Sequence, residues 1–281
     1  MMTEKLIVTI DNGARKFTFG DEFRDFSILS YSGFAAADFD VKLSSGGASD
    51  GGYISTARLG SRTLELKFDF GGRNAESVRQ SLIGFFAPGK PLTITAQRGS
   101  VVRTIEGRAS DFDITESNRH APSVASLSVL CPDPFFKAAN SVYVSAAVST
   151  PLFRLPCHFP CVLGAQSSNG EIEIFNSGDT YAEMAVELAA ASSVTAPYIL
   201  NRTNGKRIKV SNTLAGGNVL TISTVRSAKN AAIGGTRCLI DPTSQFSDFL
   251  EVGLNQLAYG SDDGSASLAA NVQYTALFYG I

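Results

Sequence analysis

The stretch Ser128-Val129-Leu130-Cys131-Pro132-Asp133-Pro134-Phe135-Phe136 decides how this chain is divided. Its first part alternates small or polar residues with apolar ones, which is typical of a strand with one buried face. Two prolines follow, and because proline lacks an amide hydrogen and restricts the preceding residue, the chain leaves its sheet here. The two phenylalanines still require burial. We therefore predict a domain junction whose linker is anchored by Pro132, Pro134, Phe135 and Phe136.

Length and composition agree with a junction at this place. The chain has 281 residues, of which 44% are hydrophobic and 18% are charged, so it is long enough for two folded domains with separate cores. We expect the first domain over 1–137 and the second over 138–281.

The charge pattern argues against two classes of partner. The chain carries 24 basic and 26 acidic residues without long basic runs, so we expect no nucleic-acid partner. Met1–Val8 lacks the pattern of a secretory signal, and no apolar stretch is long enough to span a bilayer, so we also expect a soluble chain with no membrane partner.

The cysteines do not form a strong metal motif. Cys157-His158-Phe159-Pro160-Cys161 holds three possible zinc ligands, but a structural site usually needs a second pair, and only the isolated Cys131 and Cys238 remain. We interpret all four cysteines as small core residues, and we expect neither a metal nor a cofactor.

The first half mixes strands with one helix. Arg62–Phe70 is the clearest strand, because Leu64, Leu66, Phe68 and Phe70 share one face. A helix is predicted over 75–86, capped by Asn74. Further strands are expected at 92–96, 101–108, 112–115 and 123–131. This half therefore reads as an α+β domain, an antiparallel sheet or split barrel with one helix.

Residues 43–53 contain four glycines and no apolar residue larger than alanine between Leu43 and Tyr53. Such a segment forms either a loop or the end of a long hairpin arm, and both interpretations remain open at this stage.

The second half reads as all β. Short strands are expected, separated by turn sequences such as Asn204-Gly205, and this spacing favours a jelly-roll β-sandwich. The expected strands are 171–175, 183–188, 207–210, 219–223, 237–240, 249–257 and 268–278.

One segment imitates a phosphate-binding loop. Gly84–Lys90 matches the first seven positions of that motif, but Pro91 stands where a serine or threonine would hold magnesium. The segment also follows a helix rather than a strand, so its amides would not converge on a phosphate. Nucleotide binding is not expected.

Enzyme chemistry has little support. The only histidines, His120 and His158, lie in turn-like sequences without a nucleophile motif. A hydrolase that pairs carboxylates remains an alternative, with Asp111, Asp113, Glu171, Glu173 and Asp241 as its candidates. We expect that the chain is not an enzyme.

Sugar binding is the best ligand hypothesis for the second half, because β-sandwiches often present aromatic rings to sugars. The chain has no tryptophan, so tyrosines would take that role, namely Tyr181, Tyr198, Tyr259, Tyr274 and Tyr279. A stand-alone carbohydrate-binding module for attachment to a host cell surface is therefore the alternative function.

Several short segments, taken in order, resemble the distal tail proteins of long-tailed, non-contractile bacteriophages, the siphophage tail-component family. In the first half they are Asp50–Tyr53, Leu59–Arg62, Phe85–Phe86 with Lys90–Pro91, and Cys131–Phe136. In the second half they are Ile174–Asp179, Ile199–Lys206, Val219–Ile222, Ser244–Phe246, Gly253–Asn255 and Tyr274–Ile281.

The resemblance implies a structural protein of a phage or prophage virion, assembled in the host cytoplasm and located at the tail tip. It implies a first domain that forms a ring, typically of six subunits, and a second, galectin-like sandwich. The expected partners are the tail tube protein, the end of the tape-measure protein, and tail-tip, baseplate or receptor-binding proteins. For the ring contact we expect the glycine-rich segment, with Ser44, Gly46, Gly47, Asp50, Gly51 and Gly52 as candidates.

Overall fold

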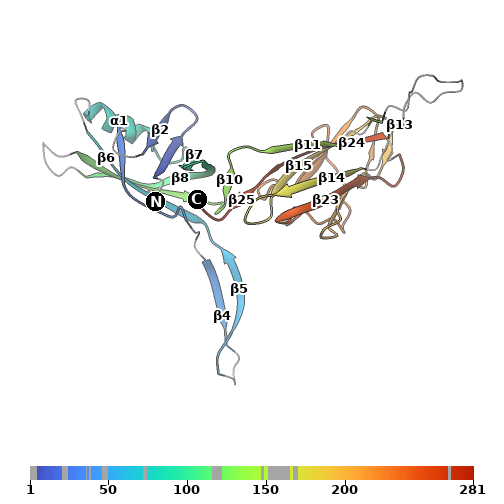
Figure 1. Cartoon of the computed structure of the whole chain (residues 1–281), viewed down its shortest axis with the longest axis horizontal. Coiled ribbons are helices and arrows are strands. Elements are labelled where there is room, and N and C mark those ends of the chain that lie inside the picture. The colour runs from blue at the N-terminus through green and yellow to red at the C-terminus, as the bar shows by residue number, and fades with distance from the viewer. Residues whose placement is uncertain are drawn as a thin grey trace, which may run out of the picture. The chain divides into compact units, whose positions relative to one another are not determined.

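The computed structural model describes residues 5–20, 25–35, 37, 39–45, 50–71, 75–115, 122–146, 149–150, 165–166, 170–264 and 267–281. The chain divides into two compact units: unit 1 is Met1–Ala139 with Phe278–Ile281, and unit 2 is Asn140–Leu277. The fold is mainly β with antiparallel sheets and, among the described residues, one α-helix, which confirms the predicted fold class (Figure 1). Unlike the uninterrupted 138–281 expected from the sequence, the last four residues return to unit 1.

Unit 1 contains most of its strands before the junction. They are β1 (Leu6–Asp11), β2 (Lys16–Phe19), β3 (Phe26–Ser32), β4 (Phe39–Ser44), β5 (Tyr53–Leu59), β6 (Arg62–Phe70), β7 (Leu92–Arg98), β8 (Val101–Thr115), β9 (Ser123–Cys131) and β10 (Phe136–Ala138), with α1 (Ala75–Phe85) between β6 and β7. Strand β25 (Leu277–Phe278) leads into the last residues of the chain.

The main sheet of unit 1 curls into a split barrel. Its strand order is β2-β1-β7-β8-β9-β6-β3, and β10 joins it beside β8 and β25. Strand β8 pairs with β7 over Val101–Gly107 and with β9 over Arg108–Thr115, and a bulge between Ala109 and Asp111 interrupts its pairing with β9. At the open side, Gly20 of the β2 end bridges Ser27 of β3. The two outer strands therefore meet only at one end.

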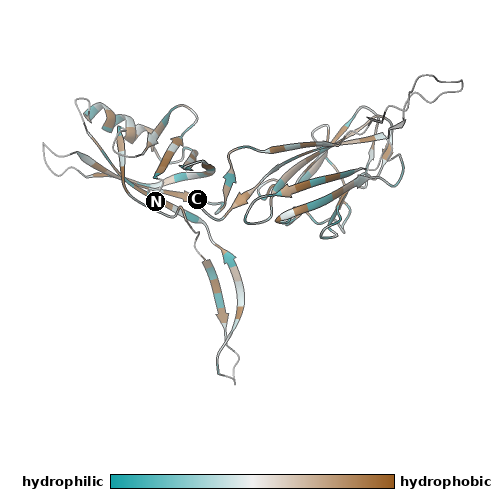
Figure 2. Ribbon diagram, viewed as in Figure 1, coloured by the Kyte–Doolittle hydropathy of each residue, from teal (hydrophilic) through white to brown (hydrophobic). Residues whose placement is uncertain are grey.

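The core of unit 1 fills this barrel. The inward residues of β6, which the alternation predicted, are all buried, and so are Leu82 and Phe85 of the helix. The helix begins and ends close to its predicted bounds, whereas its expected cap, Asn74, lies outside the described residues. In Figure 2, apolar and polar residues alternate along the strands of the ribbon.

Unit 2 is a β-sandwich. Its strands are β11 (Val142–Ala146), β12 (Ser149–Thr150), β13 (Ala165–Gln166), β14 (Glu171–Asn176), β15 (Glu183–Ala190), β16 (Val194–Thr195), β17 (Tyr198–Asn201), β18 (Arg207–Lys209), β19 (Thr213–Leu214), β20 (Val219–Ser223), β21 (Asn230–Ile233), β22 (Thr236–Arg237), β23 (Gly253–Gly260) and β24 (Leu268–Thr275).

Two sheets share the core of unit 2. One has the order β11-β24-β15-β20-β21-β22 and the other β14-β23-β17-β18. Inward side chains of both sheets belong to one buried cluster, for example Val186 and Val272 of the first sheet with Ile174 and Ile199 of the second. The outer residues of these strands are polar or partly exposed, as expected when each sheet buries one face.

Two predicted strands of unit 2 are wrong at their bounds. The strand expected at 249–257 begins at Gly253, because the side-chain amides of Asn201 and Asn255 bind the carbonyls of Phe249 and Glu251 at 2.7 and 2.8 Å and hold residues 249–252 out of the sheet. The strand expected at 237–240 is only the two-residue β22, because the amide of Leu239 binds the side-chain oxygen of Asn212 instead, at 2.7 Å.

Candidate assembly surface

A buried arginine holds the junction in unit 1. Arg62 takes an inward position of β6 and is 1% exposed. Its Nε donates a hydrogen bond to the carbonyl of Pro134 at 2.7 Å, and its Nη1 donates one to the carbonyl of Gly33 at 2.5 Å. The third donor, Nη2, binds the carbonyl of Tyr279. One guanidinium group therefore connects β6, the linker and the end of the chain.

Two of the four predicted anchor residues, Pro134 and Phe136, contact this arginine. Phe136 is completely buried, and its ring centroid is 4.9 Å from the Arg62 guanidinium carbon. Phe135 is also buried and packs against the ring of Tyr279 at 5.7 Å. Pro134 contributes its carbonyl, whereas Pro132 is exposed. We retain the interdomain anchor as a proposal, and the packing assigns most of it to the phenylalanines.

The last residues of the chain complete the cluster. The guanidinium carbon of Arg103 lies 3.6 Å from the ring centroid of Phe278, and Arg103 also binds the carbonyl of Gly280. The amide of Ile281 donates to the carbonyl of Phe34 at 2.9 Å. A Cβ atom at Gly280 would lie 1.7 Å from the carbonyl oxygen of Ala35, so only glycine permits this close approach.

The glycine-rich segment ends a long hairpin, here called the arm. The arm consists of β4 and β5, which pair only with each other among the described strands (Figure 1). Asp40 and Arg58 form an ion pair across it at 2.8 Å, and the hydrogen bond from Arg58 lowers the pKa of the Asp40 carboxyl. The structure therefore has the hairpin arm rather than a plain loop.

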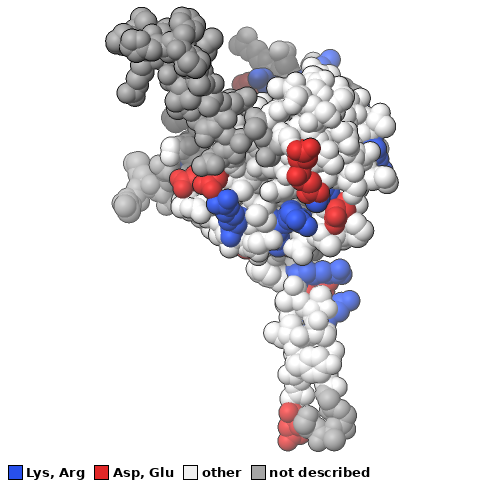
Figure 3. Space-filling model, turned by 90° about the vertical axis from the view of Figure 1, so that its right-hand side faces the viewer, with Lys and Arg blue, Asp and Glu red and all other residues white. Residues whose placement is uncertain are grey.

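One face of the arm is apolar. Strand pairing places Phe39 opposite Leu59, Val41 opposite Ala57 and Leu43 opposite Ile54, so these six side chains share a face. Phe39 is 74% exposed, Leu43 73% and Ile54 62%. In Figure 3 the arm is largely uncharged between its base and its tip. An isolated two-stranded hairpin is marginally stable in water, and this apolar face has no cover within the described chain.

The ring-contact candidates lie at the tip, beyond the apolar face. Ser44 is the last residue of β4 and is half-buried, whereas Asp50, Gly51 and Gly52 are exposed. Gly46 and Gly47 lie outside the described residues. Sequence reasoning missed the apolar face itself, although the alternation of Phe39, Val41 and Leu43 is a readable strand signal.

The lookalike of a phosphate loop has a structural role. Gly84 lies in the last turn of α1, and the Nζ of Lys90 donates to its carbonyl at 3.1 Å. A helix C-terminus presents carbonyl oxygens, which repel phosphate. Lys90 therefore caps the helix.

The other chemical candidates do not converge. Asp111 and Asp113 are exposed on β8 of unit 1, whereas Glu171 and Glu173 are exposed on β14 of unit 2. No group of three potential metal ligands exists among the described residues. His120, Cys157, His158 and Cys161 lie outside those residues. Cys131 is buried and Cys238 partly buried, both as free thiols.

In the part of the chain that is described, no helix is long and apolar enough to cross a membrane.

The five tyrosines also separate. The hydroxyls of Tyr259 and Tyr274 donate to the carbonyls of Ala146 and Phe175, at 2.9 and 3.0 Å, which is a packing role. Tyr279 belongs to unit 1 rather than to the sandwich. The Nζ of Lys206 lies over the ring of Tyr181, at 5.5 Å from the ring centroid. Tyr198 lines a groove on unit 2.

Comparisons with known proteins agree with the resemblance read from the sequence. Residues 177–278 match the model of a family described as the siphovirus-type tail component, C-terminal domain. This match confirms the resemblance predicted from the sequence.

The whole chain is similar in fold to the Dit protein of phage SPP1. That crystal structure has a TM-score of 0.65 at 14% identity, covering 97% of this chain and 99% of that chain. The SPP1 protein is described as a paradigm of the hub adsorption apparatus in phages that infect Gram-positive hosts. Chains of the activated phage P2 baseplate also match, at 11% identity and a TM-score of 0.49. The calcium form covers 98% of both chains. The strontium form covers 96% of this chain and 97% of that one. No curated protein sequence matches.

Proposed function

We propose that this chain is a structural component of the distal end of a siphophage tail, and that unit 1 assembles into a ring, with six subunits as the expected number. The apolar face of the arm carries this proposal, because an exposed apolar strip on a thin hairpin requires a partner surface. A ring supplies one in the form of the neighbouring subunit. The family match and the SPP1 Dit fold support the location.

A ring requires two different patches on every subunit. The arm is the first patch, and the outer edge of β3 is our candidate for the second. Leu29 and Tyr31 of β3 are both partly exposed apolar residues, and a bulge leaves Leu29 outside the pairing with β6. Beyond Ser27, no described strand pairs with this edge. The arm of one copy would pack along this edge of the next.

Mixing two variants tests this arrangement. Leu43→Asp damages the arm and Leu29→Asp damages the edge, so neither variant alone should form rings. In a mixture, the intact arm of the Leu29→Asp variant can pack on the intact edge of the Leu43→Asp variant. The mixture should therefore form dimers but no rings, as measured by sedimentation velocity. Thr56→Asp, on the polar face of the same arm, is the matched control and should assemble like the unmodified chain.

Two results would contradict the arrangement. Rings from Leu43→Asp at the same concentration would exclude the apolar face, and a mixture that stays monomeric would exclude the pairing of arm with β3. Negative-stain images of the assembled protein would count the subunits directly.

The adaptor role follows from the ring. A ring at the tube end would contact the tail tube protein and the end of the tape-measure protein, and unit 2 would be available to tail-tip, baseplate or receptor-binding proteins. Co-expression with the proteins of the same tail, followed by pull-down of assembled and ring-deficient chains, tests these contacts.

We also propose that the function is structural rather than catalytic. Sustained release of reducing sugar from host cell-wall polysaccharide would contradict that.

A further inference from the structure

Unit 2 carries a polar groove of about 540 Å³ on the outer face of its four-stranded sheet. Side chains alternate along β17 and β18, and this alternation determines which of them line the groove. Ile199 and Ile208 point into the core, so their neighbours in each strand point outward. The groove is lined mainly by Tyr198, Leu200, Arg207, Gln245, Ser261 and Asp262. No residue of this groove takes part in the ring contact proposed above.

The aromatic member of the groove has a fixed position. Tyr198 lies opposite Gly260 in the pairing of β17 with β23. A Cβ atom at Gly260 would lie 2.8 Å from the Tyr198 hydroxyl and 3.0 Å from its ring carbon Cζ. The absence of a side chain at Gly260 therefore lets the phenol ring lie across the neighbouring strand. Tyr198 is partly buried and lines the groove.

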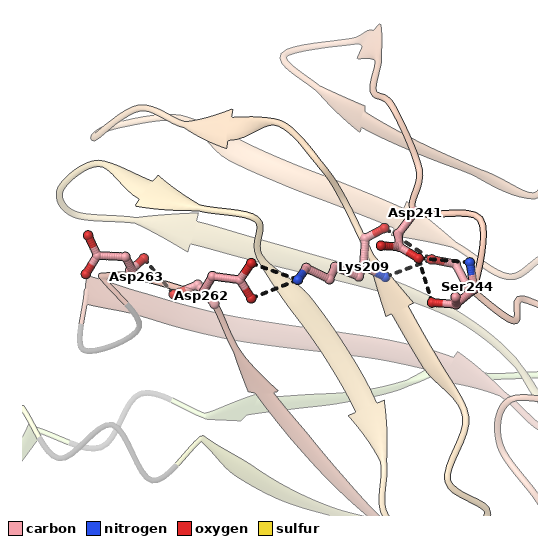
Figure 4. A network of polar contacts seen from close by, with 7 residues as sticks. Lys209, Asp241, Ser244, Asp262 and Asp263 are labelled. Atoms are coloured by element: carbon pink, nitrogen blue, oxygen red, sulfur yellow. Dashed lines mark hydrogen bonds and ion pairs between the residues drawn. The ribbon is translucent and has the colours of Figure 1, made fainter.

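The carboxylate of Asp262 is also held in place (Figure 4). The Nζ of Lys209 contacts both carboxylate oxygens of Asp262 at 2.8 Å. The backbone amide of Asp262 donates to the carbonyl of Thr195 at 3.0 Å. Each carboxylate oxygen retains further capacity to accept hydrogen bonds. Asp262 is therefore a preorganised acceptor at the groove.

The loop that carries Gln245 is tied to β18. The amide of Lys209 donates to the Oγ of Ser244 at 3.0 Å, and the amide of Gln245 donates to the carbonyl of Arg207 at 2.9 Å. Within the described chain, the side chains of Arg207 and Gln245 make no hydrogen bond of their own. Both planar groups are therefore available as donors at the groove.

The charges of this region cancel. Arg207 and Lys209 supply two positive charges, and Asp241 and Asp262 supply two negative ones. Hydrogen bonds from Thr243, with Arg207 nearby, lower the pKa of Asp241, so Asp241 is ionised at neutral pH. Two carboxylates beside the groove oppose an anionic ligand such as phosphate. A neutral ligand rich in hydroxyl groups matches this arrangement better.

We propose that this groove binds a neutral saccharide. The apolar face of a sugar ring would lie on Tyr198, while Asp262 accepts hydrogen bonds from hydroxyls and Arg207 and Gln245 donate to hydroxyl or carbonyl oxygens. The site is open and shallow, so a single copy binds at millimolar concentration. The proposal does not depend on ring formation.

Saturation-transfer NMR on the full-length protein tests the site, with maltotriose and tri-N-acetylchitotriose as probes. Gln245→Ala should weaken binding by roughly fivefold, the cost of about one hydrogen bond, and Tyr198→Leu by about tenfold. Tyr143→Leu is the matched control, because Tyr143 is a 74% exposed aromatic residue of β11 in the other sheet. It should bind like the unmodified chain.

Each other outcome overturns the proposal. Binding that Tyr143→Leu removes and Tyr198→Leu preserves would place the site on the other sheet. Inorganic phosphate that displaces the sugar would identify an anion site, and no signal from either probe at millimolar concentration would exclude a saccharide site. If thermal melting shows that Tyr198→Leu disturbs folding, Gln245→Ala alone tests whether the groove binds the saccharide. Gln245 is exposed, so its replacement should leave the fold intact.

Discussion

The Nε of Arg62 donates a hydrogen bond to the carbonyl of Pro134 at 2.7 Å, although these residues are 72 positions apart in the chain. The same guanidinium binds carbonyls of Gly33 and Tyr279 and lies over the ring of Phe136. A buried charge is costly unless its donors are satisfied, and here backbone carbonyls satisfy them. We infer that Arg62 keeps the linker and the chain end attached to unit 1.

Arg62→Met should therefore be strongly destabilising. It removes three hydrogen bonds of a buried side chain and leaves partly buried carbonyls without this donor, so we expect a loss of about 3 to 5 kcal/mol in the free energy of unfolding of unit 1. Urea unfolding gives the value, and limited proteolysis should show faster cleavage near residues 132–137. The control is Arg58→Met, which breaks an exposed ion pair and should therefore cost much less stability than Arg62→Met. Equal costs would contradict the role of Arg62.

Phe136→Ala should cost on the order of 3 to 5 kcal/mol, because its ring is completely buried. Phe135→Ala should cost less, since its ring packs against the partly exposed Tyr279. Phe175→Ala, at a 63% exposed position of β14, provides the baseline for an exposed ring. A Phe135→Ala/Phe136→Ala variant with unchanged melting and unchanged cleavage between the units would refute the anchor.

Deletion of Ser44–Gly52 should weaken ring assembly, because it removes the tip of the arm together with its last strand pair. The apolar face formed by Phe39, Val41 and their partners remains after this deletion. We therefore expect a smaller effect than for Val41→Glu, which places a charge within that face. Sedimentation velocity over a concentration series compares the two. Unchanged assembly after the deletion would show that the tip has no role.

The thiol of Cys131 predicts a pH effect on stability. Burial raises its pKa to about 12, above the ordinary value of a cysteine thiol, so the folded chain keeps this proton while the unfolded chain loses it. The contribution of the thiol is complete below about pH 9 and is lost as pH rises toward the folded value, at about 1.4 kcal/mol per pH unit.

A comparison with Cys131→Ala isolates this effect from other groups that titrate at high pH. The stability advantage of the unmodified chain over the variant should shrink between pH 9 and pH 10 by about 1 kcal/mol, because the unfolded thiol titrates near the start of this interval. Denaturant unfolding at each pH measures it. An advantage that stays constant over this interval would mean that the thiol is not protected by burial.

Much of the fold could be read from local patterns. Strands β6 and β9 have their predicted bounds, because side-chain alternation reports a buried face directly, and helix α1 follows from its apolar stripe. Strand β8 was predicted in two pieces, because the bulge between Ala109 and Asp111 interrupts its alternation. Patterns of this kind depend only on neighbours in sequence.

What the sequence alone determined is thus the class of the fold and the burial of the two phenylalanines after Pro134. Only the tertiary structure decided that Arg62 is buried, because the carbonyls that satisfy it come from positions 33, 134 and 279. The groove beside Tyr198 likewise joins β17, β18, the loop at Gln245 and the end of β23. Contacts between residues so distant in sequence leave no periodic signal, because the folded chain alone brings them together.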